Sequence, residues 1–185
     1  MILEPGDIVV DLGANVGVFT VLASVLASRV ISVEAQSGFV DQIYENAARN
    51  GARDRVEVEF GLIGAGAGAF SDATVLHSAT HFGAEPPILT MPDLMRRHAL
   101  DHIDFLKVDI EGSEFALFAE VSEWLTSVDR MAMEVHPKFG DIDHLVTILR
   151  DAGFQADAFD YDRRVQPGAP QETRYILARR REQHT

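Results

Sequence analysis

One stretch near the start, from residue 8 to residue 20, constrains the fold more than any other part of the chain. A continuous apolar run ends at Asp11, a turn containing Gly13 and Gly17 follows, and an apolar pattern with helical spacing then begins. This order is typical of a buried parallel strand, a tight turn and a helix whose N-terminus faces a ligand. The two glycines should let the backbone approach that ligand. Because ligands of open α/β sheets bind at the carboxyl ends of strands, we expect a nucleotide-like cofactor here.

The next segments repeat the same pattern. Residues 30–34 form a second apolar run that ends in Glu34, a helix is expected at 37–50, and residues 56–60 alternate as a third strand. Strands that alternate with helices indicate a parallel sheet with right-handed crossovers. Glu34 follows the glycine turn at a spacing of about 20 residues, at which an acid reaches ribose hydroxyls in nucleotide-binding folds.

The second half of the chain continues this alternation and then changes. We expect strands at 103–110 and 131–135, with helices at 92–99, 113–125 and 142–149. A short strand at 73–77 is also predicted. Two last strands, at 154–159 and 174–178, are separated by a polar loop with no room for a helix, so they should pair antiparallel. The prediction is one domain over residues 1–185, a three-layer α/β/α sandwich whose sheet has about seven strands.

Two further expectations concern packing. Val18, Leu22, Val25 and Leu26 recur at helical spacing, which predicts a helix that packs on the sheet through this stripe. The three arginines at 179–181 should form a solvated end of the chain.

Composition limits the class of partner. The net charge is −13 and the sequence pI about 4.8, which argues against binding a nucleic-acid backbone. The absence of cysteine excludes disulfides, thiolate metal sites and cysteine nucleophiles. No signal peptide or apolar run of about 20 residues is present, so we expect a cytoplasmic protein without membrane contact.

Three motifs resemble one enzyme family. The turn Asp-Leu-Gly-Ala-Asn-Val-Gly at 11–17 is not the dehydrogenase G-x-G-x-x-G; it looks like the first motif of Rossmann-like methyltransferases that use S-adenosylmethionine (SAM). Residues 103–114 resemble the I-D-x-L-K-x-D-x-E-G-x-E signature of the FkbM-type family, and residues 133–136 its later E-x-H. The resemblance spans roughly residues 7–136.

The resemblance implies transfer of a methyl group from SAM to an oxygen, usually a hydroxyl of a natural product or a sugar. It also implies a set of cofactor-binding residues. The methionine and ribose portions should be lined by Asp11, Gly13, Asn15 and Gly17. Glu34 should bind the ribose hydroxyls, and Leu62 and Ile63 should contact the adenine.

Four residues are candidates for the chemistry. Lys107 and Asp109 alternate onto one side of a strand that otherwise reads as buried. They form either an internal ion pair or a functional pair, in which Asp109 touches the cofactor or acceptor and Lys107 orients it or acts as a base. Glu111 should face the cleft, whereas Glu114 could simply stabilise the start of a helix. His136, at the ligand edge, is a candidate general base.

A metal site is not favoured. The acids Asp109, Glu111 and Glu134 could bind a hard divalent ion, but we assign no metal ligand.

Two departures from the family pattern weaken the inference about the substrate. Glu34 is followed by Ala35 where members usually have proline, and members usually carry a longer N-terminal extension that helps to cover the substrate. We therefore expect a more open acceptor site, or one completed by another subunit in a homo-oligomer. Residues 61–87 and 160–172 should shape the acceptor pocket.

Three functions are compatible with these observations. The first is a SAM-dependent O-methyltransferase that acts on a small molecule. The second is an N-methyltransferase acting on an amine, which needs less help from a base. The third is a catalytically silent module that binds SAM or a nucleotide and interacts with a partner.

Overall fold

The computed structural model describes residues 3–64, 84–119, 122–161, 163–165 and 173–181. The strand expected at residues 73–77 lies outside these ranges. None of the helices in the described part of the chain is long and apolar enough to cross a membrane.

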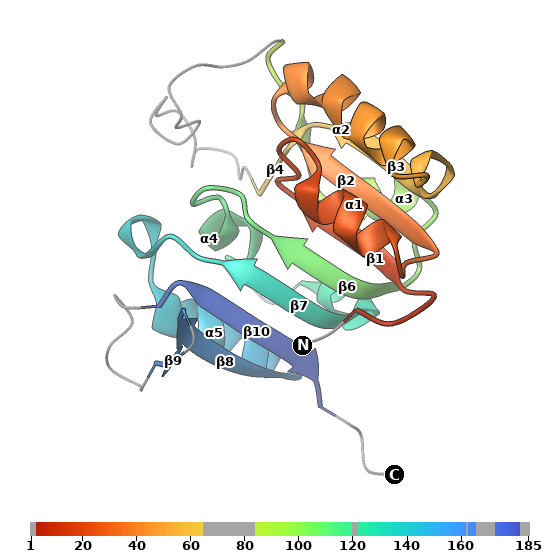
Figure 1. Ribbon diagram of the computed structural model, residues 1–185. Helices are drawn as coiled ribbons and strands as arrows, with labels where there is room; N and C mark the ends of the chain where they lie inside the picture. Colours follow the sequence, from red (N-terminus) through yellow and green to blue (C-terminus); the bar gives the residue numbers. More distant parts are fainter. Residues whose placement is uncertain (1–2, 65–83, 120–121, 162, 166–172, 182–185) are drawn as a thin grey trace.

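One mixed sheet forms the centre of the molecule (Figure 1). Its strand order is β3-β2-β1-β6-β7-β10-β8-β9. In chain order the bounds are β1 (Ile8–Leu12), β2 (Arg29–Glu34), β3 (Val56–Phe60), β6 (Ile103–Val108), β7 (Val128–Glu134), β8 (Phe154–Asp160), β9 (Arg163–Arg164) and β10 (Tyr175–Arg180). The first five strands in the sheet are parallel, and β10 runs antiparallel to both β7 and β8. This confirms the predicted sheet, to which β9 adds a two-residue strand.

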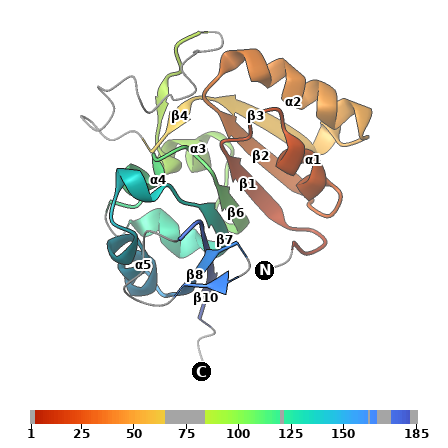
Figure 2. The same ribbon diagram turned by 60° about the vertical axis from the view of Figure 1, so that its left-hand side comes forward.

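Helices lie on both faces of the sheet, which confirms the three layers (Figure 2). They are α1 (Val18–Ser24), α2 (Ser37–Arg49), α3 (Met91–Arg97), α4 (Glu114–Leu117) and α5 (Ile142–Asp151), with single 3₁₀ turns η1 (Arg53–Arg55), η2 (Glu123–Ser127) and η3 (Pro137–Phe139). A separate pair, β4 (Leu62–Ile63) and β5 (Ile88–Leu89), is parallel. Val9 of β1 packs in the cluster beneath α1 and α2, and Val10 packs in the larger cluster with α3 and α5. Alternate residues of this buried strand therefore pack in the two clusters on opposite faces of the sheet.

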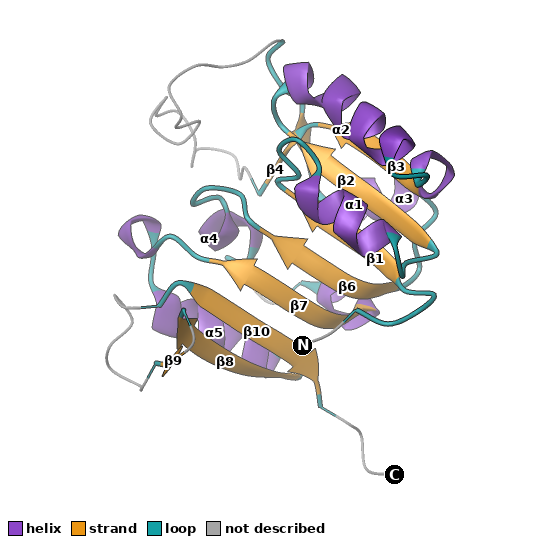
Figure 3. Cartoon of the chain, viewed as in Figure 1, coloured by secondary structure: helices purple, strands orange, loops and turns teal. Residues whose placement is uncertain are grey.

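One face of the sheet is only half covered. Helices α1 and α2 contact β1, β2 and β3, whereas no described helix lies over β6, β7, β10 and β8 on that face (Figure 3). Side chains on this half line the pocket that is described below.

The predicted apolar stripe of α1 does not pack on the sheet. Val18, Leu22 and Val25 are 75%, 62% and 73% exposed, and Leu26 is also exposed. The helix instead approaches the sheet through Phe19, whose ring stacks on Phe105 of β6, and through small side chains. Among the small side chains is Thr20, which is buried and bonds to groups on β1 and β2. The hydrogen bonds of Thr20 orient α1 with this side towards the sheet, so the apolar stripe that the periodicity predicted faces away from the sheet.

The helix expected at 113–125 is shorter than predicted. The α-helical part ends at Leu117, and a 3₁₀ turn carries Trp124. The rings of Phe118 and Trp124 lie 5.6 Å apart, and both are buried in the core. The apolar positions belong to the core, as predicted, but the chain buries them by turning rather than by continuing the helix.

The arginine tail is not a free end. Arg179 and Arg180 belong to β10, and Arg180 donates to the carbonyl of Ala152 at 3.3 Å. Its guanidinium also lies 4.6 Å from the centroid of the Phe154 ring. The first two arginines of the tail therefore belong to an inner strand of the sheet, between β7 and β8.

Candidate active site

The site lies where β1, β2, β6 and β7 end side by side. Asp11 of β1 is in register with Lys107 of β6 and with Ser32 of β2. Parallel pairing therefore brings together residues that are far apart in the sequence, as the motif order predicts.

Lys107 joins the ends of β1 and β6. Its Nζ lies 3.1 Å from Oδ1 of Asp11 and 3.7 Å from Oδ2 of Asp109. The same ammonium donates to the carbonyl oxygens of Gly13 at 2.7 Å and of Leu12 at 3.3 Å. Lys107 therefore approaches Asp109, its predicted partner, and forms a closer ion pair with Asp11, which the sequence did not predict.

Asp11 is a positioning residue in this structure. Its side chain has no exposed surface, and Oδ2 accepts a hydrogen bond from the hydroxyl of Thr20 at 2.7 Å. Oδ1 faces Lys107. The expected direct contact with a cofactor is not available to a carboxylate enclosed in this way, so Asp11 acts through the groups that it holds.

The glycine turn is packed against protein atoms. Gly13 has φ +78, and a Cβ there would lie 1.8 Å from the carbonyl oxygen of Asp109. A Cβ on Gly17 would lie 3.1 Å from the side chain of Ile43 on α2. Glycine is therefore required at position 13 for the close approach to Asp109 and at position 17 for the contact with α2. We had expected these glycines only to let the backbone approach a ligand. Asn15, at the exposed tip, has φ 52.

Glu34 holds the turn from the end of β2. Its carboxylate accepts one bond from the N–H of Asn15 and one from the N–H of Gln36, each at 2.7 Å. Burial raises the pKa of Glu34, while these backbone bonds act in the opposite direction. Each oxygen keeps a second lone pair for a ligand hydroxyl.

The two residues predicted to contact adenine differ in exposure. Ile63 is 2% exposed and packs in the main core, whereas Leu62 is partly exposed. Leu62 is therefore the one of the two that a ligand could reach.

His136 is oriented by Glu114. Oε1 of Glu114 lies 2.9 Å from Nδ1 of His136 and accepts the backbone N–H of the same residue at 2.7 Å. Oε2 accepts from the N–H of Gly112 at 2.8 Å, and Glu114 has no exposed surface. The hydrogen bond that His136 donates to Glu114 raises the pKa of His136, although burial opposes it. The sequence predicted only that Glu114 stabilises the start of a helix. Its position as the last glutamate of the motif at 103–114 could have indicated that it orients His136.

Asp109 and Glu111 lie beside the imidazole. Nε2 of His136 is 3.4 Å from Oε2 of Glu111, and the three side chains offer one ligand atom each within 4.8 Å. Carboxylates often gather in this way without an ion, so no metal ligand is assigned. A second such group, His102 with Asp104 and Asp129, lies at the opposite ends of the strands.

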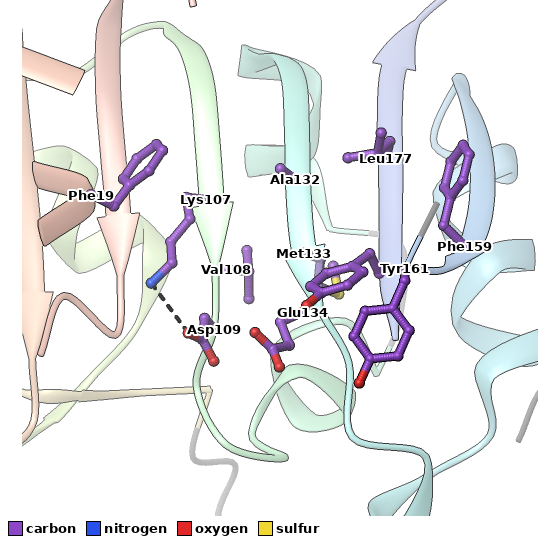
Figure 4. Close-up of a pocket in the computed structure, with 11 residues that line it drawn as sticks. Phe19, Lys107, Val108, Asp109, Ala132, Met133, Glu134, Phe159, Tyr161 and Leu177 are labelled. Atoms are coloured by element: carbon purple, nitrogen blue, oxygen red, sulfur yellow. Dashed lines mark ion pairs between the residues drawn. The ribbon is translucent and has the colours of Figure 1, made fainter. Parts of the chain in front are cut away.

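An open pocket of about 480 Å³ adjoins this cluster on the uncovered face of the sheet (Figure 4). Lys107, Asp109 and Glu134 form its polar end. Burial, and next the charge of Asp109, raise the pKa of Glu134. The apolar remainder includes Tyr161 and five residues that the sequence did not identify: Phe19, Ala132, Phe159, Tyr175 and Leu177.

Tyr161 belongs to the segment 160–172, which was expected to shape the acceptor pocket. Residues 65–83, 162 and 166–172 of the two expected segments lie outside the described part of the chain.

A model of the methyltransferase FkbM domain matches residues 11–156. The chain belongs to the FkbM methyltransferase family. This match confirms the family expected from the motifs, and the family makes the protein a SAM-dependent methyltransferase. No protein with curated functional data matches the sequence.

Solved structures share the fold of this FkbM-family chain. An O-methyltransferase from Bacillus cereus, solved in complex with SAH (S-adenosylhomocysteine), is 19% identical with a TM-score of 0.55; the alignment covers 95% of this chain and 74% of the neighbour. Precorrin-6y C5,15-methyltransferase from Geobacter metallireducens is 12% identical with a TM-score of 0.57, covering 97% and 82%. Precorrin 8w decarboxylase from Methanobacterium thermoautotrophicum is 15% identical with a TM-score of 0.55, covering 95% and 82%. At these identities the likeness shows the fold alone.

The residues of the site fit SAM, the cofactor of this family. Glu34 is the last residue of β2 and Asp109 follows β6, and these two strands lie on either side of β1. Carboxylates therefore flank the glycine turn. The cofactor is a sulfonium cation with ribose hydroxyls, which such carboxylates suit. Lys107, the cation nearest the turn among the described residues, is held by Asp11 and by backbone carbonyls. When bound, SAM supplies a methyl group activated by its positive sulfur.

Proposed function

We propose that the protein transfers the methyl group to a hydroxyl oxygen of a small natural product, with His136 as general base. The observation that carries this proposal is the pair of His136 and the buried Glu114, 2.9 Å apart. A carboxylate on Nδ1 fixes the tautomer that leaves Nε2 free to accept a proton. An alcohol must lose a proton on methylation, whereas a neutral amine attacks through its own lone pair. The presence of an oriented general base therefore favours a hydroxyl acceptor over an amine.

The residues have separate roles in this proposal. Nε2 of His136 accepts the hydroxyl proton as the new carbon–oxygen bond forms and the carbon–sulfur bond breaks. Glu114 stabilises the resulting imidazolium, and Glu111, 3.4 Å from Nε2, adds a second negative charge. Lys107 keeps Asp109 at the pocket end. Glu34, with the turn at Asn15, holds the ribose end of the cofactor.

The acceptor in this proposal is a small molecule rather than a nucleic acid. The net charge of −13 and the carboxylates around Asp109 repel a phosphate backbone. The pocket of about 480 Å³ is in the size range of small-molecule sites.

The test is to incubate the protein with labelled SAM and matched panels of alcohols and amines, and to identify the methylated product. We expect methyl ethers from the wild type. His136→Gln should lower turnover by about 10²- to 10⁴-fold while leaving affinity for S-adenosylhomocysteine unchanged in calorimetry.

His144→Gln is the matched control, because His144 is an exposed histidine on α5. It should keep full activity. N-methylated products alone, or an undiminished rate of ether formation in His136→Gln, would contradict the proposal. Binding of S-adenosylhomocysteine without any turnover would favour the silent module instead.

A further inference from the structure

A slot with aromatic side chains opens from the uncovered sheet face onto the active-site edge. Phe19 of α1 lies on one side of it, Phe159 and Tyr161 lie on the other, and Ala132 of β7 lies between them (Figure 4). Its volume of about 480 Å³ suits a molecule of one to a few rings. The slot ends at Lys107, Asp109 and Glu134, so whatever fills it meets the catalytic edge.

The aromatic side is held in an unusual conformation. Tyr161 has φ 52, a left-handed backbone that is costly for a bulky residue, and its side chain is exposed. The ring meets Tyr175 edge to face, with centroids 6.5 Å apart and an interplanar angle of 68°. A strained backbone that presents an exposed aromatic ring beside a second ring provides a surface for stacking.

The charge at the inner end of the slot is negative. Asp109 and Glu134 both line it, and the nearby ammonium of Lys107 is shared with Asp11 and two backbone carbonyls. The charge of Glu134, and next burial, raise the pKa of the Tyr175 hydroxyl, whereas the charge of Arg174 acts in the opposite direction. Arg174 lies 5.9 Å from the centroid of the Tyr161 ring, so the negative charge is confined to the inner end of the slot. An anionic group next to the reacting oxygen would be repelled.

We infer that this slot is the acceptor site, and that it takes an aromatic alcohol or phenol with no carboxylate, phosphate or sulfate near the reacting hydroxyl. The inference rests on the proposed O-methylation, because the hydroxyl must lie at the Asp109 end, where Asp109 and His136 come within 4.8 Å. The ring packs against the aromatic side of the slot, which Phe159, Tyr161 and Tyr175 form. A second copy of the chain is a poorer occupant, because it would bring another net charge of −13 towards the same carboxylates.

The experiment measures binding separately from chemistry. The protein is saturated with S-adenosylhomocysteine, and ligand-observed NMR gives the Kd of three probes: phenylethylene glycol, phenylethanolamine and mandelate. The three share a ring and a benzylic hydroxyl, and they differ in the neutral, cationic or anionic group next to it. We expect mandelate to bind at least about tenfold more weakly than the glycol.

Variants locate the effect. Phe159→Ala should weaken the binding of all three probes by about tenfold, because the ring loses its apolar contact. Glu134→Gln should strengthen mandelate binding and leave the glycol unchanged. Ile88→Ala is the matched control, since Ile88 is an exposed apolar residue of β5 that does not line the slot.

Three results would overturn the inference. The first is mandelate binding as tightly as the glycol, and the second is unchanged binding of all probes to Phe159→Ala. The third is a dimer in light scattering that Leu177→Asp dissociates while no probe binds, which would assign the slot to a second copy.

The outcome for the reaction is read independently. If the probes bind in the expected order but no hydroxyl is methylated, O-methylation fails and the ligand class of the slot stands. If aliphatic or anionic alcohols become methyl ethers while no probe binds, the acceptor class fails and O-methylation stands.

Discussion

The ammonium of Lys107 lies 3.1 Å from Oδ1 of Asp11, a carboxylate with no exposed surface. This oxygen accepts no hydrogen bond from the described residues, so the charge of Lys107 is what compensates it. The pair spans neighbouring strands directly beneath the glycine turn. It therefore serves both the stability of the sheet and the placement of Asp109.

Replacing Lys107 by methionine should cost about 3–5 kcal/mol of unfolding free energy, because it leaves a buried carboxylate uncompensated. Urea denaturation measures this loss. Lys138→Met, at the exposed lysine within η3, should change stability by less than about 1 kcal/mol. Adding Asp11→Asn to Lys107→Met should restore most of the loss. A double variant as unstable as the sum of its parts would show that the two charges do not interact.

Glu114→Gln should separate positioning from folding. The amide keeps the size of the side chain and one oxygen that can accept the backbone N–H of either Gly112 or His136, but it lacks the charge that raises the pKa of His136. The acid limb of kcat/KM against pH should therefore move to lower pH, towards the ordinary value of 6.5. Glu111, Asp109 and Glu134 still act on the imidazole in the variant, so the pKa of His136 keeps part of its rise. The plateau should fall by about 10²-fold.

The matched variant for this test is Glu123→Gln, on η2 and away from the imidazole. Its pH profile should coincide with that of the wild type. If Glu114→Gln lowers only the melting temperature and leaves the limb in place, Glu114 is a structural residue alone.

The sequence predicted the sheet well because strand and helix periods, glycine turns and strand-end acids are local signals. The same local patterns predicted a direct ligand role for Asp11, yet tertiary contacts with Thr20 and Lys107 enclose it. Glu114 illustrates the opposite error. Its partner His136 is 22 residues away, so its role depends on how β6 and β7 align, which no local pattern records.

Packing errors have a related physical origin. The exposed stripe of α1 has a correct helical period, but periodicity does not say which neighbour is present to cover it. Phe159 and the following Tyr161 reach the site through β10, because Tyr175 is in register with Phe159 of β8 on one side and with Glu134 of β7 on the other. That arrangement follows from the whole topology and not from the segment itself.

Cofactor affinity should depend on pH through Glu34. Burial raises the pKa of Glu34 above its ordinary value of 4.5, so the carboxylate protonates at a higher pH than a free glutamate and then loses an acceptor for ribose hydroxyls. Affinity for S-adenosylhomocysteine should fall as the pH is lowered towards that raised value. Because the folded state then binds the proton more tightly than the unfolded chain, the free protein gains stability from Glu34 over the same range.

Calorimetry at several pH values checks this. Glu34→Gln should bind S-adenosylhomocysteine at least about tenfold more weakly near neutral pH, with a flatter pH dependence. Glu45→Gln, at an exposed position on α2, should behave as the wild type. Unchanged affinity in Glu34→Gln would reject the ribose assignment.

Two glycines with positive φ should respond very differently to alanine. Gly51 has φ +68, and a Cβ on it would meet no atom within 4 Å, so Gly51→Ala should cost only about 1 kcal/mol, from the left-handed backbone. Gly13 has φ +78, and its Cβ would fall 1.8 Å from the Asp109 carbonyl oxygen. Gly13→Ala must push β1 and β6 apart, at a cost of about 4 kcal/mol or more. Urea denaturation of both variants measures the difference, and equal costs would mean that the contact between the turn and Asp109 does not form.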